Sequence, residues 1–212
     1  MTVFLFDLDG TLADSLPIIL HTSRLALREC GKEVSDEQIT ALIGMPLLQT
    51  GELLLGPGMG EHYRACYQKH FYNIDTCKLS AFPGIADLLA KLKEGGAKLA
   101  CVTSKRQKPA EATLAQIGLL QFFSALVCAE STTCHKPEAE PALTALAMLG
   151  ATTEKAYFIG DSIFDIGCAS NANIISCGVL WGAGEEQQLS EAGAAYIAHN
   201  VEELSAILLA AL

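Results

Sequence analysis

From residue 81 onward, short apolar segments alternate with segments of helical spacing, and this alternation restricts the possible folds more than any other feature. The apolar segments are continuously hydrophobic, which is typical of strands buried on both faces in a parallel sheet. One further apolar segment, VFLF, occupies residues 3–6. We therefore expect a doubly wound parallel α/β sheet. Its other strands are expected at residues 97–103, 125–129, 156–160, 174–180 and 194–198.

Residues 15–80 do not follow this alternation. Their apolar spacing instead predicts helices, at residues 16–30, 36–43, 47–54 and 61–72. Ser35 and Gln38 have the spacing of a capping box. A helical insert directly after the first strand would lie above the carboxyl ends of the strands, where α/β folds bind ligands. We therefore expect a Rossmann-like α/β core of residues 1–14 and 81–212, and an all-helical cap of residues 15–80.

Polar side chains follow several of the expected strands. The segment FLFDLDGTLADS begins at residue 4, and the others are VTSK at 102–105, HKPEAEP at 135–141 and GDSIFD at 160–165. Because the carboxyl ends of parallel strands meet at one edge of a sheet, we expect these segments to form one site. The site would combine carboxylates, hydroxyls and one ammonium group, from Asp7, Asp9, Asp161, Asp165, Thr103, Ser104 and Lys136.

Carboxylates gathered around one ammonium group would repel one another strongly unless a cation joined them. Oxygen ligands favour a hard divalent ion, which in a cell is Mg²⁺. Magnesium usually keeps some of its waters and recruits a substrate phosphate, so the site predicts phosphoryl chemistry. The net charge of −10 disfavours a broad surface for nucleic acid or an anionic membrane. We therefore expect a small phosphorylated metabolite as the partner.

Taken together and in order, these motifs resemble those of the haloacid dehalogenase superfamily. The matching residues are DLDGT at 7–11, Thr103, Lys136 and GDSIFD at 160–165. The expected helical cap lies between the first and second motifs, as it does in that family. Within the superfamily, ALIGMPLLQ, VTSK and VLWGAG are similar to segments of phosphoglycolate-phosphatase-like members. Those members commonly have glycine where this chain has Asn173, which we interpret as a turn in the left-handed backbone region.

The resemblance implies catalytic roles. Asp7 would be the nucleophile that forms an aspartyl-phosphate. Asp9 would first protonate the leaving oxygen as a general acid and then activate water as a general base. Thr103 and Lys136 would hold the phosphoryl oxygens, with assistance from Thr11 and the Ser104 amide.

The resemblance also implies a metal site. Asp7 and Asp161 would be direct ligands of Mg²⁺, and Asp9 would contribute its backbone carbonyl. Asp165 would act as a ligand or as a partner that orients one.

We therefore expect a Mg²⁺-dependent phosphatase that hydrolyses a small phosphomonoester, phosphoglycolate-like, through an aspartyl-phosphate. A sugar-phosphate mutase and a pyrophosphatase of the same superfamily stay open, although GMPLLQ at 44–49 lacks the arginine-bearing loop of the mutases. The non-enzymatic alternative is a phosphoacceptor signalling module. Such modules have about half this length, and their acceptor does not precede a helical insert.

Other features predict less. His62, Cys66 and His70 share one helical face and have a spacing that suits zinc, although such a row is more often an ordinary helix face. GPGMG at 56–60 lacks the spacing of a nucleotide loop and predicts a helix-breaking loop. The eight cysteines are scattered, as in a chain with reduced thiols. With no basic leader and no long apolar stretch, we expect a cytoplasmic protein. We also expect it to be a monomer or homodimer.

Overall fold

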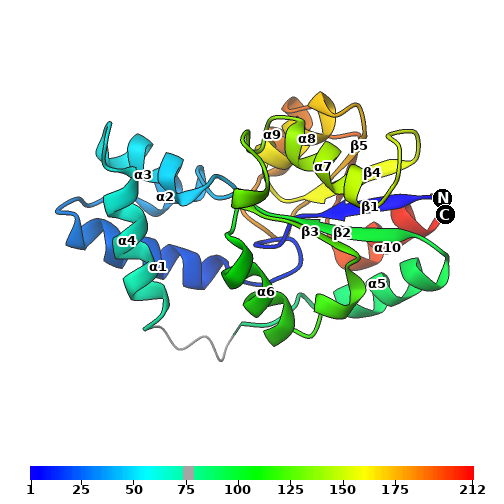
Figure 1. Cartoon of the computed structure of the whole chain (residues 1–212), viewed down its shortest axis with the longest axis horizontal. Helices are drawn as coiled ribbons and strands as arrows, with labels where there is room; N and C mark the ends of the chain where they lie inside the picture. The colour runs from blue at the N-terminus through cyan, green and yellow to red at the C-terminus, as the bar shows by residue number, and fades with distance from the viewer. Residues whose placement is uncertain (74–78) are drawn as a thin grey trace.

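A parallel sheet forms the centre of the computed structural model, which describes residues 1–73 and 79–212 (Figure 1). The six strands are ordered β3-β2-β1-β4-β5-β6, and every neighbouring pair is parallel. They are β1 (Val3–Phe6), β2 (Lys98–Val102), β3 (Ala125–Val127), β4 (Ala156–Gly160), β5 (Ile175–Val179) and β6 (Tyr196–Ala198). The doubly wound α/β fold is confirmed, and β1 lies between β2 and β4.

Helices cover both faces of the sheet, which explains the continuous hydrophobicity of its strands (Figure 1). In β1, Phe4 and Phe6 belong to the core beneath α5 (Ile85–Glu94), α6 (Gln107–Gln116) and α10 (Val201–Leu209). Val3 and Leu5 belong to the opposite core, beneath α7 (Glu140–Met148) and α8 (Ile163–Asn171). Successive side chains of a strand point to opposite faces, so every residue of β1 is buried.

A group of helices between β1 and α5 stands beyond the edge of the sheet toward which β1 points (Figure 1). We call this group the helical insert: α1 (Leu16–Glu29), α2 (Asp36–Thr40), α3 (Leu47–Leu55) and α4 (Gly60–Phe71). The insert has its own core, which contains Leu27, Ile39, Leu54, Tyr63 and Tyr67. The capping box at the start of α2 is confirmed, since the Ser35 hydroxyl accepts from the Gln38 N–H and the Gln38 side chain accepts from the Ser35 N–H.

The two connections between the insert and the α/β unit run side by side. The Asp14 N–H donates to the Ser80 carbonyl at 2.9 Å, and the Phe82 N–H donates to the Leu12 carbonyl at 3.0 Å. The insert is therefore attached along one short paired segment. Residues 74–78 of the expected cap lie outside the described residues, so the range 15–80 stays a prediction.

Some short elements were not predicted from the sequence. These are α9 (Glu186–Glu191) and the 3₁₀ turns η2 (Leu120–Phe122) and η3 (Ala129–Ser131). In α9 the buried residue is Leu189, which is too little apolar surface to give a periodic pattern. The expected left-handed turn is present at Asn173, where φ is 55°. The first four residues of GPGMG, 56–59, form the turn between α3 and α4, and Gly60 begins α4. Among the described residues, no helix has the length and apolar character needed to span a membrane.

Candidate active site

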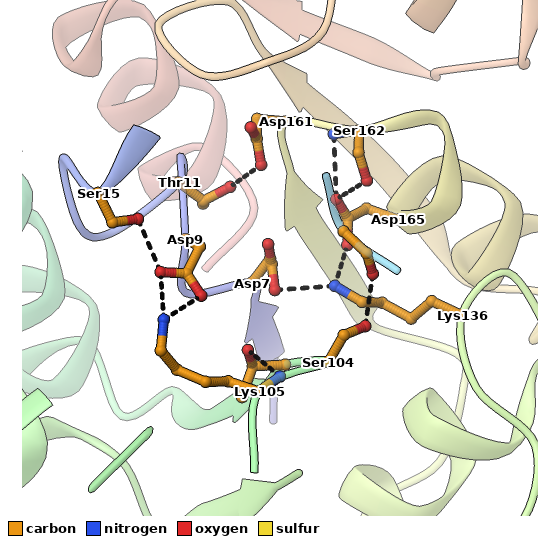
Figure 2. Close-up of polar contacts among 12 residues, drawn as sticks. Asp7, Asp9, Thr11, Ser15, Ser104, Lys105, Lys136, Asp161, Ser162 and Asp165 are labelled. Carbon is orange, nitrogen blue, oxygen red and sulfur yellow. Dashed lines mark hydrogen bonds and ion pairs between the residues drawn. The ribbon is translucent and has the colours of Figure 1, made fainter. Parts of the chain in front are cut away.

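The polar residues predicted at the strand ends do meet at one edge of the sheet (Figure 2). Asp7 directly follows β1, Thr103 follows β2 and Asp161 follows β4. Because β1 lies between β2 and β4, Asp7 has the other two strand ends on either side. Lys136 reaches the same place from the loop before α7, and Asp165 reaches it from the first turn of α8.

Lys136 joins two of the carboxylates. Its Nζ lies 2.8 Å from Asp7 Oδ1 and 2.6 Å from Asp165 Oδ1, and the lysine side chain is 2 % exposed. Ser162 secures the other oxygen of Asp165 through its N–H at 3.0 Å and its hydroxyl at 2.6 Å. Burial alone would lower the pKa of Lys136, but the charges of Asp165 and Asp7 outweigh burial and raise it. The ammonium group is therefore charged at neutral pH.

Three buried carboxylates form an acid triad: Asp7, Asp161 and Asp165. One carboxylate oxygen from each of the three lies within 4.8 Å of the other two. Burial, followed by the charges of neighbouring acids, raises the pKa of Asp7 well above its usual value. The same two causes raise the pKa of Asp161 to about 7. One ammonium group does not balance three acids, and a compact set of buried oxygen donors fits a hard divalent cation.

Asp161 is held from two sides. The Thr11 hydroxyl donates to its Oδ1 at 3.1 Å, and the Ala183 N–H donates to its Oδ2 at 2.7 Å. Gly10 also packs against it, because a Cβ at position 10 would come within 2.2 Å of Asp161 Oδ2. The φ of Gly10 is +79°, a conformation that favours glycine. The glycine of DLDGT thus permits the approach of the first and fourth motifs.

Asp9 lies apart from the acid triad and has an ammonium partner of its own. Lys105 Nζ is 2.6 Å from Asp9 Oδ1 and 2.7 Å from Oδ2, and the Ser15 hydroxyl donates to Oδ1 at 2.7 Å (Figure 2). The expectation of a single ammonium group was therefore wrong. The second ammonium group belongs to Lys105, the last residue of VTSK. The pairing of β1 with β2 brings the segments that follow these strands together, so the position of Lys105 in VTSK was the sequence signal for it.

The other two residues of VTSK differ in what they contact. Thr103 is buried, and its hydroxyl oxygen accepts from the Lys105 N–H at 3.2 Å. The Ser104 hydroxyl instead donates to the carbonyl of Gly44, in the loop between α2 and α3 of the insert. The Ser104 side chain thus connects the sheet edge to the helical insert. The expected assistance of the Ser104 amide in phosphate binding stays a prediction.

A cavity of about 420 Å³ lies between the sheet edge and the insert. On the α/β side it is lined by Asp7, Asp9 and residues 103–106. On the other side it is lined by residues of α1, α2, α3 and α4 and of the loop that contains Gly44. A ligand in this cavity could reach Asp7 of the acid triad and contact the insert at the same time.

The histidine and cysteine row predicted on α4 is divided in the structure. His70 pairs with Glu29 at 2.7 Å. His62 and Cys66 instead lie near Cys30 at the end of α1, and the donor atoms of these three residues are within 4.8 Å of one another. The packing of α1 on α4 explains this grouping, which spacing along α4 alone could not reveal. None of the three lines the described cavity.

Comparisons with known proteins identify the family of this chain. Residues 4–179 match the family model described as haloacid dehalogenase-like hydrolase. Pyrophosphatase PpaX of Listeria monocytogenes is 28% identical over 210 residues, which cover 98% of this chain and 96% of the relative. Probable phosphatase IndB of Dickeya dadantii is 33% identical over 207 residues, which cover 94% of this chain and 90% of the relative.

The solved structure of a "predicted phosphatase" from Clostridium acetobutylicum has the same fold. It superposes with a TM-score of 0.89 at 28% identity and covers 99% of this chain and 98% of that one. The family match spans most of the chain and includes all of the motif residues that meet at the sheet edge. The chain belongs to the haloacid dehalogenase-like hydrolase family of phosphatases.

Proposed function

We propose that this protein is a Mg²⁺-dependent phosphatase that hydrolyses the phosphomonoester of a small metabolite through an aspartyl-phosphate on Asp7. One observation carries the proposal. A buried carboxylate, Asp7, is oriented by Lys136 at the floor of a cavity, while a second carboxylate, Asp9, is held separately by Lys105 and Ser15. Two carboxylates with different partners can take two different roles.

In the first step, an oxygen of Asp7 attacks phosphorus and the bond from phosphorus to the leaving oxygen breaks. Asp9, in its protonated form, gives its proton to that oxygen. In the second step, Asp9 takes a proton from water, the water oxygen attacks phosphorus, and the bond to Asp7 breaks. Inorganic phosphate leaves and Asp7 is restored. Lys136 and Thr103 hold the phosphoryl oxygens as negative charge develops on them.

Mg²⁺ fits the acid triad, and we propose that Asp7, Asp161 and the backbone carbonyl of Asp9 hold it. When bound, it neutralises the triad and the phosphoryl group. Both oxygens of Asp165 accept hydrogen bonds from Lys136 and Ser162, which supports an orienting role for Asp165. The Thr11 hydroxyl donates to Asp161, so we propose that Thr11 orients a metal ligand as well as assisting phosphate binding.

We further propose that residues 1–14 and 81–212 form the catalytic core and residues 15–80 form the cap. The paired connections at Asp14 and Phe82 support this division, because relative motion there would open the cavity to substrate. In this arrangement the core performs the chemistry and the cap contacts the leaving group.

Phosphate release is the direct test. The purified chain is assayed with p-nitrophenyl phosphate, 2-phosphoglycolate and pyrophosphate, with MgCl₂ or with EDTA. We expect hydrolysis with Mg²⁺, none with EDTA, and none by Asp7→Asn. Full activity in EDTA would overturn the metal assignment. Stable phosphorylation of Asp7 by acetyl phosphate, with no turnover of any ester, would favour the signalling module instead.

Pyrophosphate stays a candidate substrate because a relative bears the name pyrophosphatase. Phosphoglycolate stays a candidate because ALIGMPLLQ, VTSK and VLWGAG are similar to segments of phosphoglycolate phosphatases. Both have an anionic leaving group, and the cavity has to accommodate it. The side chains that line the cavity therefore bear on the choice between them.

A further inference from the structure

The cavity is much larger than the reacting phosphoryl group requires. Its volume of about 420 Å³ lies in the range of sites that enclose small organic molecules. The phosphate leaving group of pyrophosphate would fill a small part of this space, and so would the two-carbon leaving group of phosphoglycolate. The volume alone suits a leaving group with a larger body.

The wall that the insert contributes is predominantly apolar. Its apolar side chains include Ile39, Leu42, Ile43, Met45, Leu48 and Phe71. Tyr63 also lines the cavity, and its hydroxyl already donates to Ser23 at 3.1 Å. Such a wall stabilises a ligand by removing apolar surface from water. It offers little to a second anion.

Each arginine and lysine in the described lining already has a carboxylate partner in the same lining. Lys105 binds Asp9, with 2.6 Å between Nζ and Oδ1. Arg64 Nε lies 2.8 Å from Glu61 Oε2, and Arg106 Nε lies 3.5 Å from Glu130 Oε1. The arginine and lysine charges of the described lining are thus matched by nearby negative charges. A carboxylate or phosphate leaving group would have to displace one of these pairs.

From the volume, the apolar wall and the paired cations, we infer that the preferred substrate is the phosphomonoester of a neutral alcohol with a largely apolar body. This inference rests on the proposed phosphatase function and names the class of its leaving group. Anionic leaving groups, including those of pyrophosphate and phosphoglycolate, bind less well because no uncompensated arginine or lysine among the described residues of the lining meets them.

The first experiment compares kcat/KM for methyl, butyl and benzyl phosphate with the values for 2-phosphoglycolate and pyrophosphate, in MgCl₂. Each methylene that enters the cavity should raise kcat/KM about fourfold, so butyl phosphate should exceed methyl phosphate clearly. Butyl and benzyl phosphate should also exceed both anionic substrates by about tenfold or more. A higher kcat/KM for pyrophosphate or 2-phosphoglycolate than for butyl phosphate would overturn the inference and leave the phosphatase function intact.

A matched pair of variants on α3 tests the wall itself. Leu48→Lys adds a cation at a lining residue that is 41% exposed, whereas Leu53→Lys adds one at a residue that is 62% exposed and does not line the cavity. Leu48→Lys should raise the ratio of 2-phosphoglycolate to butyl phosphate hydrolysis by about tenfold, and Leu53→Lys should leave it unchanged. An equal ratio in both variants would contradict the role of the wall.

Removal of a counter-charge is an independent test. Glu61→Gln leaves Arg64 without its carboxylate partner. The ratio of 2-phosphoglycolate to butyl phosphate hydrolysis should therefore rise, although no new cation is added. p-Nitrophenyl phosphate serves as a probe with an activated leaving group in every assay. If neither it nor any alkyl ester releases phosphate in MgCl₂, the proposed function and this inference both fail.

Discussion

The two walls of the cavity are built in different ways. The sheet edge has buried acids joined by hydrogen bonds to Lys136, Ser162, Thr11 and a backbone N–H. The insert wall has mostly apolar side chains, and its Arg64 is paired with Glu61. The polar groups of the sheet edge would contact the phosphoryl group, which is the same in every substrate. The side chains of the insert wall would contact the leaving group, which differs between substrates. Substitutions in the two walls should therefore change different quantities.

The largest effect is expected for Asp7→Asn. The amide has the shape of the carboxylate but is a poor nucleophile, so kcat/KM should fall by about 10⁴-fold or more with every ester. Thermal stability should not fall, because the substitution removes one buried acid whose pKa burial raises. Melting curves and phosphate assays with several esters measure both. A loss confined to some esters would contradict the division between the two walls.

Asp9→Asn should separate the two steps of the reaction. Loss of an acid/base group typically slows a step by about 10²–10⁴-fold. p-Nitrophenyl phosphate has a leaving group that needs little protonation, so its first step should be partly spared, whereas water attack still needs the base. We expect a burst of p-nitrophenol followed by a stall, with a phosphoryl group on Asp7. Rapid-quench kinetics and intact mass measure these quantities. Wild-type turnover of alkyl phosphates would rule out the role of Asp9.

The sheet edge should also respond to pH and metal. Asp161 has a folded-state pKa of about 7, raised by burial and by the charge of Asp165. An acid whose folded pKa is raised contributes stability below its unfolded pKa near 4, and this contribution is lost as pH rises toward 7. In EDTA, the melting temperature should therefore fall between pH 5 and pH 8. Added Mg²⁺ should restore more stability at pH 8 than at pH 5.

Asp161→Asn is the control for that experiment. It removes the titrating carboxyl, so both the fall in melting temperature and the response to Mg²⁺ should become smaller. Leu53→Lys, an exposed substitution in the insert, should retain both. If the wild-type melting temperature in EDTA is constant between pH 5 and pH 8, the acid triad does not titrate in this range.

The sequence predicted the sheet edge far better than the insert wall. Strands buried on both faces leave continuous apolar segments, and the residues that follow them must meet at one edge. That rule, applied to the predicted parallel sheet, grouped Asp7, Thr103 and Asp161 from the sequence alone. Lys105 escaped it, although it lies in VTSK, because its partner depends on how a long side chain crosses from one strand end to the next.

The insert wall follows no such rule. Helical spacing predicted α1 through α4, but it did not predict how they pack on one another. The grouping of Cys30 with His62 and Cys66, and the pairing of His70 with Glu29, depend on the packing of α1 against α4. The choice of cavity-lining residues depends on the same packing. The sequence alone therefore could not predict which side chains would contact a leaving group.

A smaller effect is expected where the two walls touch. Lys105 pairs with Asp9 of the sheet edge and also lies over the ring of Phe71 on α4, 5.8 Å from its centroid. Lys105→Met removes a hydrogen-bonded ion pair that is about 15% exposed, so kcat should fall by about tenfold with alkyl esters. The fall should be smaller with p-nitrophenyl phosphate, since its leaving group depends less on Asp9. Lys105→Arg, which keeps the charge, should recover part of the loss.

Phe71→Leu gives the smallest effect and locates the contact between the two regions. It keeps the Lys105–Asp9 pair and an apolar wall but removes the aromatic ring. A partly exposed cation–π contact contributes about 0.5–1 kcal/mol, so a change of about twofold to fivefold in kcat or KM is expected.

If the contact between Lys105 and Phe71 holds the insert near the sheet edge, the change appears in KM with alkyl esters, while the burst rate with p-nitrophenyl phosphate is retained. If it positions Lys105 toward Asp9, kcat falls instead, with the same dependence on the leaving group as in Lys105→Met. Measurements of kcat and KM on both variants distinguish these outcomes. Identical kinetics of Phe71→Leu and the wild type would show that the ring of Phe71 does not couple the insert wall to the sheet edge.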